Sequence, residues 1–157
     1  MTALAPIRTI VFAGAAGGLV DFLYASGLQL SRGRAFEKLW QGVASGWIGK
    51  AAGEGGWATA VLGIATHFGI AIVMAAAYAL AATRVAILYR RPVLSGVVYG
   101  FILYAVMYGI VLPARFGRPP LKWDGLISVM DIAAHIGVAV VLAFVLSRPR
   151  PAENSLT

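Results

Sequence analysis

Long apolar stretches, separated by short polar ones, make up most of this chain. Four of them, at residues 9–30, 57–82, 93–112 and 126–146, contain few charged side chains. Roughly 20 apolar residues are enough for an α-helix to cross the hydrocarbon core of a bilayer. The pattern therefore predicts an all-α membrane protein, a four-helix transmembrane bundle formed by a single domain at residues 1–147. Residues 148–157 are polar and predict a disordered tail.

The segment between the first two apolar stretches, at about residues 35–51, has a different pattern. Its apolar residues recur at steps of three and four, so they share one face of a helix. Tryptophans and lysines on such a helix favour a position in the headgroup plane of the membrane. We expect an amphipathic interfacial helix here, and the alternative is a loop with a short helix lying on the bundle. The residues behind this prediction are Trp40, Trp47, Lys38 and Lys50.

Composition supports the membrane assignment. Hydrophobic residues make up 60% of the 157 residues and charged residues 12%, more apolar surface than a soluble domain of this size could bury. The net charge of +7 favours anionic lipid headgroups over nucleic acid as the partner, because the basic residues lie between the apolar stretches. The chain has no cysteine, which excludes disulfides, thiolate zinc sites and iron–sulfur clusters.

The distribution of positive charge does not decide the orientation in the membrane. With four spans, six Lys and Arg residues fall on the side of the termini and seven on the opposite side. The positive-inside rule needs a clear excess on one side. We favour an orientation with both termini inside, where the Arg90–Arg91 pair agrees with the basic end of the chain, and dual topology is the alternative.

Pairs of small residues predict close contacts between helices. Gly14 and Gly18 form one Gly-x-x-x-Gly pair, and Gly96 and Gly100 form another. In a bilayer, helices associate through packing because lipid removes the hydrophobic drive between them, and glycines let two backbones approach. These four residues are therefore the expected packing glycines.

Four ionisable residues lie inside the apolar stretches: Asp21, His67, Asp131 and His135. A charged group at the bilayer centre costs roughly 2.5–3.5 kcal/mol on insertion scales, so these side chains should face the bundle interior. Asp131 and His135 are four residues apart and share a helix face. We expect the Asp131 carboxylate to orient the His135 ring by accepting a hydrogen bond, and the pair to meet His67 with Asp21 nearby, in a buried Asp/His cluster.

Three interpretations of this cluster compete. The first is a hydrogen-bonded network that fixes how the helices meet, and the second is a path for protons or ions. The third is ligation of haem b by His67 and His135, or of a divalent metal by the histidines and carboxylates. The first two need no cofactor, and we expect none.

The sequence favours a protein that is not an enzyme. It has no paired nucleophile and base, no phosphate-binding loop and no H-E-x-x-H helix. The favoured function is an accessory subunit of a larger membrane complex, and a small transporter or proton-conducting protein is the alternative. Expected partners are the lipid bilayer and either the larger complex or further copies of the chain, and not nucleic acid.

Three stretches carry a resemblance to a known group of proteins. "EGGWATAVLGIATHF" at residues 54–68, "RRPVLSGVVYG" at 90–100 and "GRPPLKW" at 117–123 resemble small bacterial inner-membrane proteins with four predicted spans. The resemblance implies location in the bacterial inner (cytoplasmic) membrane. It also implies that Asp21, His67 and His135 lie in characteristic segments of the group, whereas Asp131 has no counterpart in that pattern.

Overall fold

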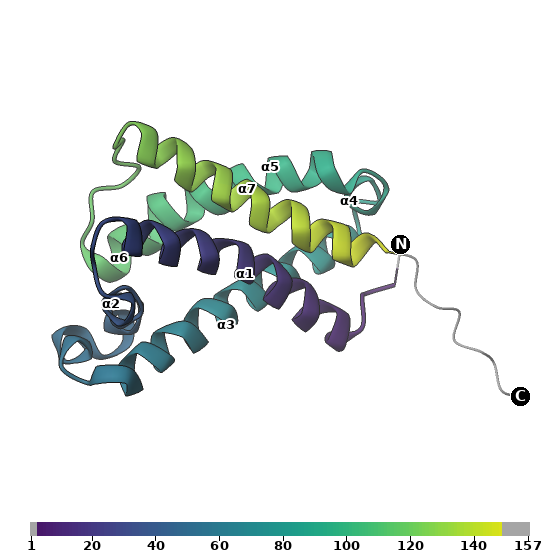
Figure 1. The fold of residues 1–157 in the computed structure, drawn as a ribbon. Helices are drawn as coiled ribbons and strands as arrows, with labels where there is room; N and C mark the ends of the chain where they lie inside the picture. Colours follow the sequence, from purple (N-terminus) through teal and green to yellow (C-terminus); the bar gives the residue numbers. More distant parts are fainter. Residues whose placement is uncertain (1–2, 149–157) are drawn as a thin grey trace, which may run out of the picture.

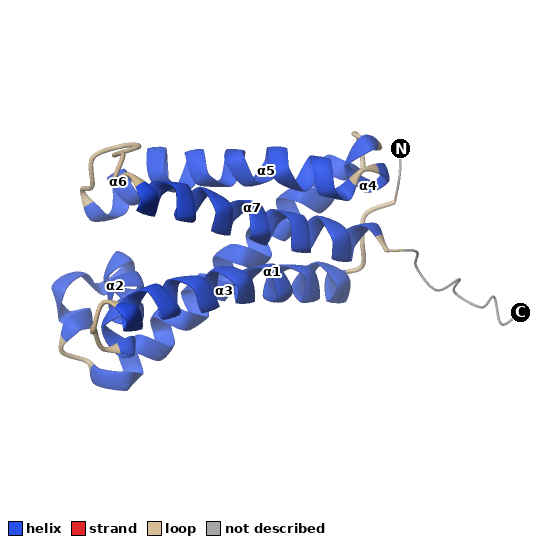
Figure 2. Ribbon diagram, turned by 45° about the horizontal axis from the view of Figure 1, so that its top comes forward, coloured by secondary structure: helices blue, strands red, loops and turns tan. Residues whose placement is uncertain are grey.

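The structure, a computed structural model, describes residues 3–148, and within this range every regular element is a helix (Figure 2). Several helices are long and the rest are short connections between them. In chain order they are α1 (Ile7–Ser31), α2 (Phe36–Ile48), the 3₁₀-helix η1 (Gly49–Gly53), α3 (Gly56–Ala82), α4 (Ile87–Arg90), α5 (Pro92–Val106), the π-helix η2 (Met107–Val111), α6 (Leu112–Phe116) and α7 (Leu126–Ser147).

Four helical stretches of the described chain are long and apolar enough to cross a membrane. They are Ile7–Ser31, Gly56–Ala82, Pro92–Phe116 and Leu126–Ser147, close to the predicted limits. Large apolar side chains remain exposed on their outer faces, such as Val73 at 67% and Leu80 at 63%. Lipid is the solvent in which such faces are stable. The prediction of a multi-pass, all-α membrane protein is confirmed at this level.

The third span continues past Pro113, where the sequence predicted its end. Proline lacks the N–H of an α-helical hydrogen bond, and its ring displaces the carbonyl four residues earlier, here that of Gly109. The helix accommodates the ring by widening into the π-helix η2 at Met107–Val111 and then resumes as α6. The Tyr108 carbonyl in η2 accepts a hydrogen bond from the backbone N–H of Leu121 (3.0 Å), so the following loop folds back onto the π-helix.

The long helices form two pairs, α1 with α3 and α5 with α7, and the pairs meet mainly between α1 and α7. α5 packs along α7, α3 packs along α1, and α1 also packs against α7, whereas α3 and α7 touch over a short length. Figure 1 shows the start of α1, the short helix α4 and the end of α7 at one end of the molecule, and α2 and α6 at the other. We call these the α4 end and the α2 end. The buried core, which includes Ala75, Tyr78, Ala139 and Leu142, joins the pairs.

The expected packing glycines lie where helices approach most closely. A Cβ atom placed on Gly14 would lie 2.5 Å from the Ile72 Cα in α3, and one on Gly18 would lie 2.9 Å from the Ala71 Cβ. The corresponding distances from Gly96 and Gly100 to the Cα atoms of Val140 and Ile136 in α7 are 2.6 and 2.5 Å. Real Cβ atoms do not approach other atoms so closely, so the two helix pairs depend on hydrogen at these positions.

Helix α2 packs against α3 and differs in detail from the expected surface helix. The Trp40 side chain is 1% exposed and stacks on Phe22 of α1, with ring centroids 4.8 Å apart, so protein and not lipid surrounds it. The Trp40 carbonyl lies over Gly63 of α3, where a Cβ atom would collide with it. Trp47 is 67% exposed, and Lys38 and Lys50 are also exposed. The two tryptophans of this helix therefore have different surroundings. The predicted polar tail lies outside the described residues, apart from Arg148.

We predict that Gly100→Ala destabilises the fold, because the new methyl group would overlap the backbone of α7 and push the α5–α7 pair apart. The expected loss is about 1–3 kcal/mol of unfolding free energy. Unfolding in mixed detergent micelles measures it. Gly69→Ala is the matched control, because Gly69 is also a mid-span glycine and its Cβ would meet nothing within 4 Å. Equal stability of the two variants would contradict the packing described here.

Candidate functional site

A cleft of about 990 Å³ lies between the two helix pairs and reaches from mid-span toward the α2 end. α1, α2 and α3 line one side of it, and α5, η2, α6 and α7 line the other. Its apolar wall includes Ile70, Met74, Leu103, Met107 and Val138. All four ionisable residues singled out from the sequence also line it, namely Asp21, His67, Asp131 and His135.

Asp131 of α7 accepts hydrogen bonds from two tyrosines on two other spans. The Tyr24 hydroxyl of α1 donates to Oδ1 (2.6 Å), and the Tyr108 hydroxyl of η2 donates to Oδ2 (2.7 Å). Such short bonds to a carboxylate are about twice as strong as bonds between neutral groups. Tyr108 lies in the first part of the π-helix η2, at Met107–Val111. Asp131 thus ties three spans together on one wall of the cleft.

His135 is held by its own helix. Its Nδ1 lies 2.8 Å from the backbone carbonyl oxygen of Asp131, which accepts hydrogen bonds and cannot donate. Nδ1 therefore carries a proton, and in the neutral ring Nε2 has the free lone pair. The ring edge meets the faces of Tyr104 and Tyr108, with centroids 5.8 Å away in both cases. The expected bond from His135 to the Asp131 carboxylate is wrong, because Nδ1 bonds to the backbone carbonyl of Asp131 instead.

Asp21 of α1 and His67 of α3 form a second polar pair across the cleft wall. The His67 Nε2 atom donates to the Gly18 carbonyl (2.9 Å), and Nδ1 lies 3.8 Å from Asp21 Oδ2. The imidazole ring also packs T-shaped against the rings of Trp40 and Phe68, with centroids 5.2 Å away in both cases.

The expected buried Asp/His cluster is absent from residues 3–148. All four side chains are half-buried, and they belong to separate polar groups, Asp21 with His67 and Asp131 with Tyr24 and Tyr108. Burial is incomplete because the cleft separates the helix pairs at this level. A direct contact between His67 and His135 is not among the interactions of the described residues.

Two observations bear on the alternative of haem or metal ligation. The His67 Nε2 atom is bonded to the Gly18 carbonyl and Nδ1 lies 3.8 Å from Asp21, so each His67 ring nitrogen has a polar protein neighbour. Within residues 3–148, no group of three or more Asp, Glu, His or Cys side chains is arranged to hold a metal ion.

Sequence reasoning overlooked Tyr24 and Tyr108, the two donors to Asp131. Tyr24 lies three residues after Asp21 and so shares its helix face, which is a usable signal. Tyr108 gave no such signal, because it lies on another span and its bond to Asp131 depends on how that span crosses α7. Tyr104 contributes its ring, which stacks on that of Tyr108 with centroids 4.5 Å apart.

Comparison with protein-family models, with curated proteins and with solved structures found no match for this chain. The interpretation of the cleft therefore rests on its geometry and chemistry.

We predict that Tyr108→Phe lowers the unfolding free energy by about 1–3 kcal/mol, because it leaves a carboxylate oxygen of Asp131 without its donor. Tyr104→Phe is the control, since it removes a hydroxyl from the neighbouring stacked ring and should change stability by less than about 0.5 kcal/mol. Unfolding of both variants in mixed micelles measures the difference. A Tyr108→Phe protein as stable as Tyr104→Phe would show that the bond contributes nothing.

Proposed function

We propose that the chain is a small, proton-coupled membrane transporter without enzymatic activity, whose cleft is the binding site. The observation that supports it best is the cleft of about 990 Å³ inside the spanning helices, lined by the Asp21–His67 pair. Intramembrane ionisable residues are costly and typically mark substrate or proton pathways. The pair can hold or release a proton without breaking the His67–Gly18 bond.

The two ends of the cleft differ as the two gates of a carrier do. At the α2 end it is lined by exposed residues of the connecting segments, such as Gly42 and Arg118. Toward the α4 end, α3 and α5 meet through Tyr78 and Tyr99, whose rings lie 5.2 Å apart, and the Tyr99 hydroxyl donates to the Met74 carbonyl. Alternating access requires one open and one closed gate around a site near the bilayer midplane.

The cleft is also the reason to prefer a transporter over an accessory subunit. A subunit that only supports a larger complex needs apolar faces for its partners, and it has no use for a ligand-sized hollow lined by ionisable groups. Pockets of about 300–1,000 Å³ are typical of small-molecule sites. The transporter therefore accounts for a feature that the accessory role leaves unexplained.

The proposal also includes the arrangement of the four spans and of α2 in the membrane. The spans act as a four-helix bundle in a bacterial inner membrane, and α2 lies at the headgroup level of the α2 end. The exposed Trp47, Lys38 and Lys50 side chains on α2 and η1 support this level, because tryptophan and lysine favour the interface.

The position of α2 predicts a difference between two neighbouring exposed residues. A cysteine replacing Lys50 should react with a membrane-impermeant maleimide, whereas one replacing Ile48, which is 45% exposed, should be shielded by lipid. Labelling of each variant in intact vesicles measures this. The chain has no cysteine of its own, so each signal comes from one site. Equal, fast labelling of both would place this helix in water.

Alternating access predicts that a cysteine replacing Ile70 in the cleft reacts with an impermeant maleimide applied from either side of the membrane. Labelling from the α2 side should be faster, and Asp21→Asn should remove the dependence of the two-sided ratio on pH. Val73→Cys, on the lipid-facing side of the same helix, is the control and should stay unreactive. Labelling of Ile70→Cys from the α2 side alone, at every pH, would exclude transport.

A further inference from the structure

Four arginines line the cleft at the α2 end. Arg32 and Arg34 follow α1, Arg115 belongs to α6, and Arg118 lies in the loop after it. All four are exposed, and they come from segments far apart in the sequence. The fold therefore gathers them on one hollow.

Among the described residues, the carboxylates of the cleft form no ion pair with these arginines. Both oxygens of Asp131 accept tyrosine hydroxyls, Asp21 faces His67, and Asp124 pairs with Lys122 (2.9 Å). The ion pairs of the described residues do not include any of the four guanidinium groups. The positive charge at this end of the cleft is consequently available to a ligand.

Among these four arginines, Arg115 has side-chain contacts with α2. Its guanidinium donates to the Gly46 carbonyl of α2 and lies over the Trp47 ring, 5.7 Å from the centroid. These contacts hold the charge at the cleft and leave other N–H donors of the fork free. Guanidinium groups suit phosphate and carboxylate because they present paired donors in a plane.

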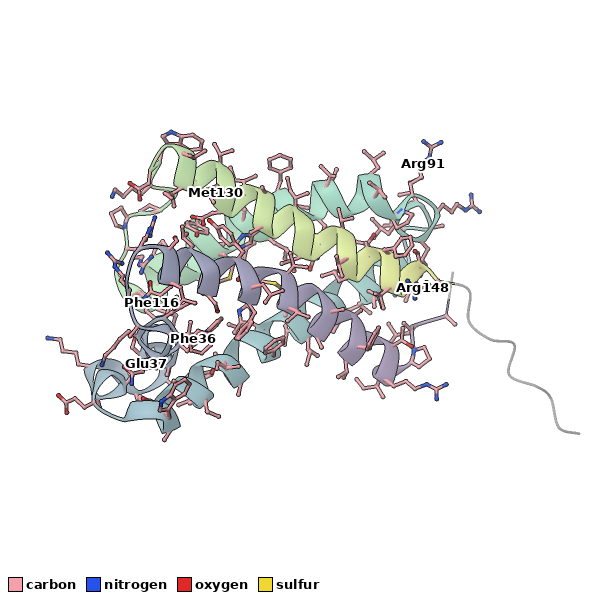
Figure 3. All side chains as sticks on the ribbon, viewed as in Figure 1. Phe36, Glu37, Arg91, Phe116, Met130 and Arg148 are labelled. Carbon is pink, nitrogen blue, oxygen red and sulfur yellow. The ribbon has the colours of Figure 1, made fainter. Side chains whose placement is uncertain are left out.

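Basic residues near the ends of spanning helices commonly meet lipid headgroups around the whole perimeter, which is the simplest explanation for them. The arginines at the α4 end agree with this explanation by lipid headgroups. Figure 3 labels Arg91 and Arg148 there, far from Phe36 and Phe116 at the α2 end, and neither arginine lines the cleft. The arginines at the α2 end differ because they surround a hollow with an apolar patch on its inner wall, which includes Ile70, Leu103 and Met107.

We propose that the cleft binds an anionic amphiphilic ligand. Its phosphate or carboxylate group contacts Arg32, Arg34, Arg115 and Arg118, and its apolar part lies against Ile70, Leu103 and Met107. The inference names the substrate class of the proposed transporter and in that sense rests on the proposed function. The anionic group can belong to a free small molecule or to a lipid headgroup, and the test distinguishes these sources.

The test is calorimetric titration of the full-length protein in a neutral maltoside detergent. The probes are inorganic phosphate, and short-chain phosphatidylglycerol alongside phosphatidylcholine of the same chain length. We expect saturable binding of an anionic probe and at least tenfold weaker binding by Arg32→Gln/Arg118→Gln, as loss of charge-assisted hydrogen bonds implies. The control is Arg90→Gln/Arg91→Gln, which removes the same charge at the α4 end and should bind like the wild type.

Binding of phosphate identifies a free anion as the source, and binding of phosphatidylglycerol without phosphate identifies a headgroup. Both outcomes support the proposal, provided that the Arg32→Gln/Arg118→Gln variant loses the binding. It is overturned if neither anionic probe binds saturably, if phosphatidylcholine binds equally well, or if both double variants weaken binding equally. Cysteine labelling from two sides needs no ligand, so anion binding with one-sided labelling would retain this site and exclude transport.

Discussion

Close backbone contact at glycine is the constraint on which the rest of the structure depends. Helices in lipid gain little from hiding apolar surface, so they associate where their backbones can approach. Gly14 brings α1 onto α3, and Gly96 and Gly100 bring α5 onto α7. Gly17, whose Cβ would lie 2.9 Å from the Val138 carbonyl, joins the two pairs. α3 and α5 have no equivalent contact at the α2 end, and the cleft is the space between them.

Long polar side chains replace glycine contacts where the helices diverge. Beyond Gly17, α1 reaches α7 through the Tyr24 hydroxyl, and η2 reaches it through Tyr108, both at the Asp131 carboxylate. A buried carboxylate tolerates a medium of low dielectric constant when donors satisfy its oxygens. The same bonds connect α1, η2 and α7 on one wall of the cleft, while the apolar residues of the wall remain free to contact a ligand. Structural and functional interpretations of Asp131 are therefore compatible.

The sequence was sufficient for the four spans and for the positions of the glycines, since length, hydropathy and small-residue spacing are local properties. It was insufficient for the polar residues, because their partners depend on how helices cross. The i, i+4 spacing of Asp131 and His135 suggested a carboxylate–imidazole bond, yet the ring bonds to the backbone carbonyl of Asp131. The third span was expected to end at residue 112, and it continues past Pro113 to Phe116 through the π-helix η2.

His67 and His135 each lie near the middle of a spanning helix, α3 and α7, and their rings have different partners. A backbone carbonyl fixes one proton on each ring, at Nε2 of His67 and at Nδ1 of His135. The other nitrogen of His67, Nδ1, lies 3.8 Å from the Asp21 carboxylate, while Nε2 keeps the contact to α1. The His135 ring lies T-shaped to the rings of Tyr104 and Tyr108. The two rings therefore have different neighbours, a carboxylate for His67 and two tyrosine rings for His135.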